Sequence, residues 1–103
     1  MTFELRRVIG ADHPSLPGHF PGEPIVPGVV ILDEIIAALN EWRADSRLAA
    51  IQSVKFLRPL KPAQPFTIHL TANDQSQNQI DFSVRVDDQL IVEGRLELAS
   101  SPS

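Results

Sequence analysis

One stretch of helical periodicity, followed only by strand-like segments, limits the folds open to this chain. From residue 28 to about residue 44, apolar side chains recur with the period of a helix and fill one wide arc. The arc comprises Ile31, Leu32, Ile35, Ile36, Ala38, Leu39 and Trp42. The opposite side carries Asp33, Glu34, Ala37, Asn40 and Glu41. So wide an apolar arc predicts a helix that other structure largely surrounds.

The segments outside this helix are typical of strands. Residues 3–9 and 48–57 are predicted strands, and alternation in residues 66–70 and 80–86 predicts strands with one buried face. A tight turn at residues 87–88 leads into a last strand over residues 90–98, in which Gly94 predicts a β-bulge. Short connections between strands favour an antiparallel sheet, on which the single helix must be buried. The predicted fold class is therefore α+β, with a curled sheet around one helix.

The composition excludes several classes of function. We expect one domain over residues 1–98 and a disordered tail over residues 99–103, because 103 residues of which 43% are apolar suit a single core. The net charge of -4, with no basic stripe, argues against nucleic acid as a partner. The absence of cysteine excludes disulfides, thiolate catalysis and zinc–cysteine sites. Asp33 and Glu34 interrupt the longest apolar run, and the apolar run within residues 1–10 is too short for the one we expect in a signal peptide. We expect a cytoplasmic protein without a membrane span, metal ion or cofactor.

A proline-rich loop precedes the predicted helix. Residues 10–27 contain five of the nine prolines, which excludes regular helix and central strand there. Three of them, Pro21, Pro24 and Pro27, recur every third residue, which suits polyproline II geometry. Fully extended, this stretch covers roughly 20 Å at about 3.1 Å per residue. Because His19 precedes the stretch and Asp33 follows it, we predict that His19 meets Asp33 of a second chain, in a site shared across a dimer.

The start of the helix has the groups needed to act on a carbonyl compound. The first backbone N–H groups of a helix have no intrahelical acceptor and carry partial positive charge, and Gly28 lets a ligand approach them closely. Such a place can hold a carbonyl oxygen that gains negative charge during a reaction. His19 can accept a proton near neutral pH, and Asp33 in a dry cleft can donate one because burial raises the pKa of a carboxyl group. Together these groups can remove a proton next to a thioester carbonyl and expel a neighbouring hydroxyl.

The segment HFPGEPIVPGVVILD, residues 19–33, resembles the active-site motif of the bacterial 3-hydroxyacyl-acyl-carrier-protein dehydratases. That pattern is a histidine, a phenylalanine, a short turn, a proline, a proline–glycine pair and an acid on the helix. In this chain the corresponding residues are His19, Phe20, Pro24, Pro27, Gly28 and Asp33. The segment VKFLRPLKP, residues 54–62, and the final hairpin extend the resemblance over residues 13–98. The chain is most similar to the small dehydratase-like proteins of aryl-polyene pigment clusters.

The resemblance implies a hot-dog fold and a homodimer, or a heterodimer with another hot-dog subunit, with active sites between the subunits. It implies dehydration of 3-hydroxyacyl thioesters on acyl carrier protein to trans-2-enoyl thioesters, in fatty-acid or polyene-type biosynthesis. His19 is then the base on C2, and Asp33 of the other subunit is the acid toward the C3 hydroxyl. The Gly28 N–H holds the thioester carbonyl, while Phe20 and Pro27 contact the substrate. The phosphopantetheine arm runs in a tunnel between the subunits.

Several residues allow a second interpretation. Asp33 also fits a helix acid that only faces water, and Glu34 is the alternative catalytic acid if the register differs by one. The family often has a glutamine four residues after the acid, where this chain has Ala37. His13 and His69 are interpreted as structural, and Trp42 as a core residue.

The basic residues and the activity also have alternatives. Lys55, Arg58 and Lys61 are candidates for contact with an acidic carrier protein or the pantetheine phosphate, and equally for a solvated surface. Two other functions suit the same fold: a non-catalytic hot-dog subunit that pairs with an active dehydratase, and an acyl-thioester hydrolase.

Overall fold

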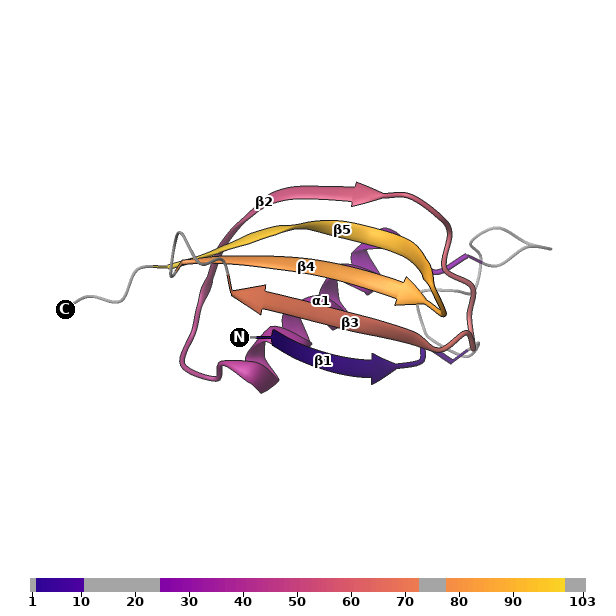
Figure 1. Cartoon of the computed structure of the whole chain (residues 1–103), viewed down its shortest axis with the longest axis horizontal. Helices are drawn as coiled ribbons and strands as arrows, with labels where there is room; N and C mark the ends of the chain where they lie inside the picture. Colours follow the sequence, from indigo (N-terminus) through magenta and orange to yellow (C-terminus); the bar gives the residue numbers. More distant parts are fainter. Residues whose placement is uncertain (1, 11–24, 73–77, 100–103) are drawn as a thin grey trace.

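A curved five-stranded antiparallel sheet packs against one helix (Figure 1). The computed structural model describes residues 2–10, 25–72 and 78–99. The elements follow in the order β1 (Thr2–Arg7), α1 (Gly28–Trp42), β2 (Leu48–Phe56), β3 (Phe66–Ala72), β4 (Gln79–Val86) and β5 (Gln89–Leu98). The α+β prediction is therefore confirmed, and α1 lies across one face of the sheet, which we call the inner face.

The position of β2 in the sheet does not follow its order along the chain. In space the strands follow the order β1-β3-β4-β5-β2, so β2 pairs with β5 at the edge opposite β1. Residues 57–65, which connect β2 to β3, must therefore cross the end of the sheet. On the way the Leu57 N–H donates to the Ile91 carbonyl, and the Leu60 carbonyl accepts a hydrogen bond from the Val26 N–H, at 2.8 Å each. The connection thus reaches the segment that leads into α1.

The core lies between α1 and the inner face of the sheet. The buried side chains of α1 are Val30, Ile31, Ile35, Ala38 and Leu39. They meet alternate residues of the central strands, among them Ile68, Leu70, Ile80, Val84, Val92 and Leu96. Four of the seven residues of the predicted apolar arc are thus buried, while Leu32, Ile36 and Trp42 are half-buried.

The helix ends two residues earlier than predicted. The Arg43 N–H donates to the Leu39 carbonyl at 2.7 Å, and a turn follows at residues 44–45. Trp42 lies at the margin of the core rather than inside it. Its ring stacks on Phe3 with a centroid distance of 5.9 Å, and the Arg43 guanidinium lies 4.4 Å from the ring centroid.

Gly94 allows the neighbouring strands to pack closely and does not form a β-bulge. Here β5 runs in regular register, with Gly94 opposite Phe82 on one side and Val54 on the other, so the predicted bulge is wrong. A Cβ at this position would lie 2.2 Å from the Ser53 carbonyl oxygen and 2.6 Å from Cζ of Phe82. Glycine is therefore needed because the neighbouring strand and the Phe82 ring approach the backbone too closely for any side chain.

The irregularities of the sheet lie largely in β2. Its register shifts between Leu48 and Ala50 and again between Ile51 and Ser53. The second shift places Ile51 and Val54 on the same face although they are three positions apart. Directly opposite residues share a face, and Ile51, Val54 and Phe56 lie opposite inner-face positions of β5. These three side chains are nevertheless 38%, 37% and 48% exposed, so β2 presents apolar groups that α1 does not cover.

Some sequence predictions fall outside the described residues. These are the predictions for His13, His19, Phe20, Pro21, Pro24 and residues 100–103. Pro27 is described, and its φ of -59° and ψ of 145° match polyproline II. No helix in the described ranges is long and apolar enough to cross a lipid bilayer.

Candidate functional site

The start of α1 has no side-chain cap among the described residues. Pro27 occupies the N-cap position, and the first turn contains no acidic residue. The Val30 and Ile31 N–H groups turn back to the Pro27 carbonyl, at 3.0 and 3.4 Å. The N–H groups of the first helical residues have no intrahelical acceptor, so this end of α1 carries partial positive charge. The predicted role of Gly28 as a hydrogen-bond donor to a carbonyl oxygen fits this geometry.

An apolar cavity of about 460 Å³ opens beside Gly28. Its walls are residues 25–26, Gly28, Ile31 and residues 56–60. Three segments meet here: the approach to α1, the first turn of α1, and the end of β2 with the connection that follows it. Arg58 is the one charged residue among these walls, so the cavity suits an apolar group with an anionic group near its rim.

Asp33 lies outside this cavity. It is exposed on the second turn of α1, in a stripe with Val29 one turn before it and Ala37 one turn after it. Val29 is 64% exposed, and Ala37, which has only a methyl side chain, is exposed as well. Asp33 is not among the residues that line the cavity beside Gly28 of its own chain. The described residues therefore bring Gly28 and Arg58 together and leave Asp33 facing away from them.

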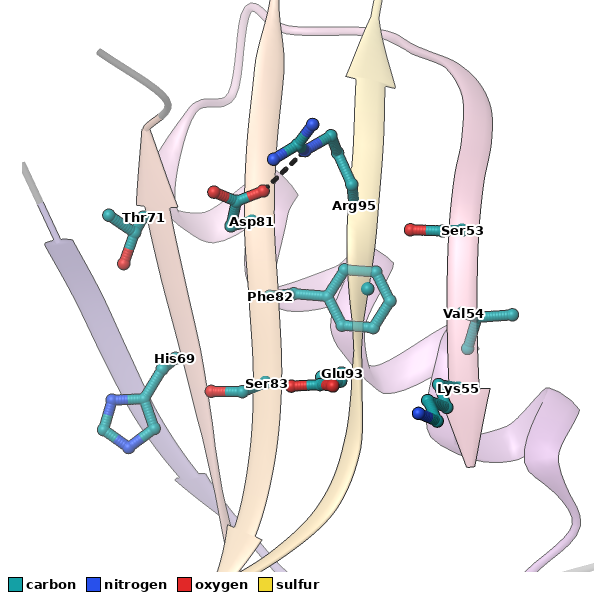
Figure 2. Close-up of a pocket in the computed structure, with 11 residues that line it drawn as sticks. Ser53, Val54, Lys55, His69, Thr71, Asp81, Phe82, Ser83, Glu93 and Arg95 are labelled. Atoms are coloured by element: carbon teal, nitrogen blue, oxygen red, sulfur yellow. Dashed lines mark hydrogen bonds and ion pairs between the residues drawn. The ribbon is translucent and has the colours of Figure 1, made fainter. Parts of the chain in front are cut away.

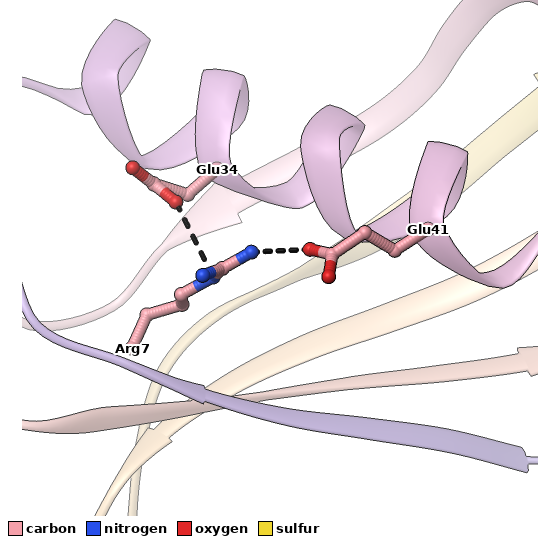
Figure 3. Close-up of polar contacts among 3 residues, drawn as sticks. All are labelled: Arg7, Glu34 and Glu41. Carbon is pink, nitrogen blue, oxygen red and sulfur yellow. Dashed lines mark hydrogen bonds and ion pairs between the residues drawn. The ribbon is translucent and has the colours of Figure 1, made fainter.

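Glu34 forms an ion pair with Arg7. Among the described residues, Asp33 has no comparable partner. The Arg7 side chain reaches from the end of β1 to α1 and lies between Glu34 and Glu41 (Figure 3). Its Nε is 3.8 Å from Glu34 Oε2, and its Nη2 donates to Glu41 Oε2. Since Glu34 is engaged in this bridge and only 31% exposed, Asp33 is the better candidate for the acid.

The three candidate basic residues do not form one cluster. Arg58 lines the cavity beside Gly28. Lys55 lies opposite Glu93 and borders a hollow on the outer face of the sheet, the face away from α1. The Lys61 backbone N–H donates to Gln64 Oε1 at 3.2 Å. Of the three, Arg58 alone stands next to the start of α1.

The hollow on the outer face differs in chemistry from the cavity at Gly28. It measures about 470 Å³, and Figure 2 shows polar side chains from four strands around it. Arg95 Nε lies 2.7 Å from Asp81 Oδ1, and His69 Nδ1 lies 3.7 Å from Glu4 Oε2. These paired side chains are typical of the solvated face of an antiparallel sheet. The structural interpretation of His69 fits this arrangement.

Phe56 is the residue of this site that sequence reasoning missed. It stands in the segment VKFLRPLKP, which the sequence analysis matched as a whole without assigning this residue a role. Its ring lies against Gly28, because a Cβ built there would be 2.8 Å from Cζ of Phe56. The contact depends on the crossing of β2 to the far edge of the sheet, and local sequence pattern does not reveal such a crossing.

Comparisons with known proteins identify a family that matches most of the chain. The family model described as "ApeI-like: ApeI dehydratase" matches residues 1–95. The 3-hydroxyacyl-[acyl-carrier-protein] dehydratase FabZ of Rickettsia bellii is 29% identical over 98 residues, covering 84% of this chain and 68% of the relative. FabZ of Rickettsia akari is 31% identical over 101 residues, covering 89% of this chain and 67% of the relative.

Solved structures show the same fold. The dehydratase heterocomplex ApeI:P from Xenorhabdus doucetiae superposes with a TM-score of 0.83 at 22% identity, covering 96% of this chain and 88% of that chain. The fluoroacetyl-CoA thioesterase FlK superposes with a TM-score of 0.76 at 15% identity, covering 96% of this chain and 84% of that chain. At these identities the likeness concerns the fold alone, and the predicted hot-dog fold is confirmed.

Proposed function

Because this chain belongs to the ApeI-like dehydratase family, we propose that it dehydrates 3-hydroxyacyl thioesters, carried on acyl carrier protein, to trans-2-enoyl thioesters. The observation that carries the proposal is the uncapped start of α1 at Gly28, which opens into an apolar cavity. A polarised N–H beside an apolar wall suits a thioester carbonyl followed by an acyl chain. The FabZ relatives, which are named for this reaction, support the same conclusion.

The reaction needs a base, an acid and a donor to the carbonyl oxygen. His19 takes the proton from C2, and the electron pair of that C–H bond forms the C2–C3 double bond as the C3–O bond breaks. Asp33 gives its proton to the departing hydroxyl, which leaves as water. The Gly28 N–H donates a hydrogen bond to the carbonyl oxygen and stabilises the negative charge that develops on it. Phe20 and Pro27 contact the substrate next to these groups.

The catalytic pair forms between two chains. Asp33 is exposed and does not line the cavity of its own chain, which supports a role in the site of a partner. The free edge of β2, with its uncovered apolar side chains Ile51, Val54 and Phe56, offers a surface for that partner. A second copy of this chain fits, because Lys55, the one charged residue of β2, points to the outer face and away from these apolar side chains. A different hot-dog subunit is the alternative, as in the ApeI:P heterocomplex.

The carrier arm enters beside Arg58. Arg58 is the one charged residue that lines the Gly28 cavity, and a guanidinium group suits the phosphate of phosphopantetheine. Lys55 and Lys61 stand apart from this cavity and serve contact with the surface of the carrier protein. The reaction takes place in the cytoplasm, where the chain meets its carrier protein.

One assay tests this function against the alternatives. The protein is incubated with 3-hydroxyacyl thioesters of several chain lengths, and the enoyl thioester and free thiol are measured by mass spectrometry. We expect water loss, which His19→Ala and Asp33→Asn each reduce by about 10²–10⁴-fold. Release of free thiol would instead indicate a hydrolase. Neither product, at any chain length, would indicate a non-catalytic subunit.

A further inference from the structure

Phe56 contacts the start of α1 without being buried. It is the last residue of β2 and faces the inner side of the sheet, yet 48% of it is exposed. Three atoms of its ring lie 2.8, 3.0 and 3.4 Å from the position that a Cβ atom on Gly28 would occupy. Carbon atoms make ordinary contacts at about 3.5–4.0 Å. With the ring in this position, a single carbon atom does not fit between Gly28 and Phe56.

The ring forms one wall of the cavity at the point where the thioester must bind. With the carbonyl oxygen at the Gly28 N–H, the carbonyl carbon is one bond away and C2 is two bonds away. C2 is therefore within reach of the Phe56 ring, which lies against the same residue of α1. Among the other walls, Val26, Ile31 and Leu60 are buried side chains of the core, which close packing holds in place, whereas residues 57–59 are exposed. Phe56 is the exposed wall residue whose ring contacts Gly28, so its ring limits the space next to C2.

We propose that Phe56 is a specificity-determining residue that restricts the site to 3-hydroxyacyl thioesters without a substituent on C2. This inference rests on the proposed function and specifies which 3-hydroxyacyl thioesters the site accepts. A C2 methyl group needs the volume that the ring occupies, and one methyl group in an apolar pocket changes selectivity by about 10–200-fold. The length of the acyl chain beyond C3 is not limited by this contact.

The test compares two substrates that differ by one methyl group. For 3-hydroxybutanoyl and 2-methyl-3-hydroxybutanoyl pantetheine, kcat/KM is measured with the unaltered protein and with Phe56→Ala. We expect the unaltered protein to prefer the unbranched substrate at least about tenfold, and Phe56→Ala to reduce that preference about tenfold or more. Ile51→Ala is the matched control, since it also shortens an exposed inner-face side chain of β2 but lies outside the cavity. An unchanged preference in Phe56→Ala, or the same change in Ile51→Ala, would overturn the inference.

A binding measurement separates this inference from the proposed activity. Analogues with an amide in place of the thioester are titrated calorimetrically into the same proteins, and Phe56→Leu is added as a milder truncation. If no protein turns substrate over but Phe56→Ala still gains affinity for the branched analogue about tenfold, the dehydratase proposal fails and the role of Phe56 stands. If the branched and unbranched analogues bind equally to all variants, the role of Phe56 fails whatever the activity.

Discussion

Asp33 and Glu34 are adjacent in the sequence but have opposite surroundings in the structure. Arg7 holds Glu34 against β1, while Asp33 faces outward beside Ala37. The sequence alone left both as candidates, because both stand on the polar side of the helix and the partner of Glu34 comes from a distant strand. We expect Glu34→Gln to change kcat/KM by less than about tenfold, and Asp33→Asn to lower it by about 10²–10⁴-fold. Steady-state kinetics on one 3-hydroxyacyl thioester decides this, and a larger loss in Glu34→Gln would assign the acid to Glu34.

Gly94 has an energetic role that its sequence context does not reveal. We expect Gly94→Ala to lower the free energy of unfolding by about 1–3 kcal/mol, because the new methyl group would collide with the Ser53 carbonyl and the Phe82 ring. Urea unfolding followed by circular dichroism measures this loss. Adding Phe82→Leu should not restore stability, since the collision with the backbone carbonyl remains. A Gly94→Ala variant of unchanged stability would contradict the close packing of β5 against β2.

At the scale of elements, the two isoleucines in the middle of α1 distinguish the buried face of the helix from its margin. Ile35 is 0% exposed, whereas Ile36 is half-buried. We expect Ile35→Ala to lower the free energy of unfolding by about 2–5 kcal/mol, as large-to-small changes in a core do, and Ile36→Ala to lower it by clearly less. The same urea unfolding measurement applies to both. Equal losses would contradict the orientation of α1 on the sheet.

Local periodicity predicted which segments form elements, but not which strands are neighbours. The alternation in β3 and β4 and the apolar arc of α1 are visible in sequence because each repeats along its own segment. The strand β2 carries two register shifts and stands at an edge, so neither its alternation nor its position along the chain indicates its place beside β5. The candidate site likewise combines residues that the sequence predicted with a contact that it did not. The sequence pointed to Gly28 and Asp33 through one contiguous motif, while the contact between Phe56 and Gly28 requires the crossing after β2.

At the scale of the whole molecule, the free edge of β2 predicts the state of assembly. We expect the unaltered chain to sediment as a dimer, and Val54→Glu to shift it toward monomer, because a charge would then stand among the apolar inner-face side chains of the edge. Ser53→Glu is the control, since it adds the same charge to the outer face of the same strand. Sedimentation equilibrium with a circular dichroism check of the fold measures this. A Val54→Glu variant that remains dimeric would place the interface elsewhere.

Mixing two inactive variants tests whether the site is shared between chains. If His19 of one chain works with Asp33 of the other, a mixed dimer of one His19→Ala chain and one Asp33→Asn chain contains one intact pair and one doubly altered pair. Random exchange of chains makes half of the dimers mixed, so the mixture should recover about a quarter of the turnover of the unaltered protein. If each site used His19 and Asp33 of the same chain, every site in the mixture would lack one of the two groups. Turnover that stays at the level of the separate variants, although sedimentation and mass spectrometry show that chains have exchanged, would therefore contradict the shared site.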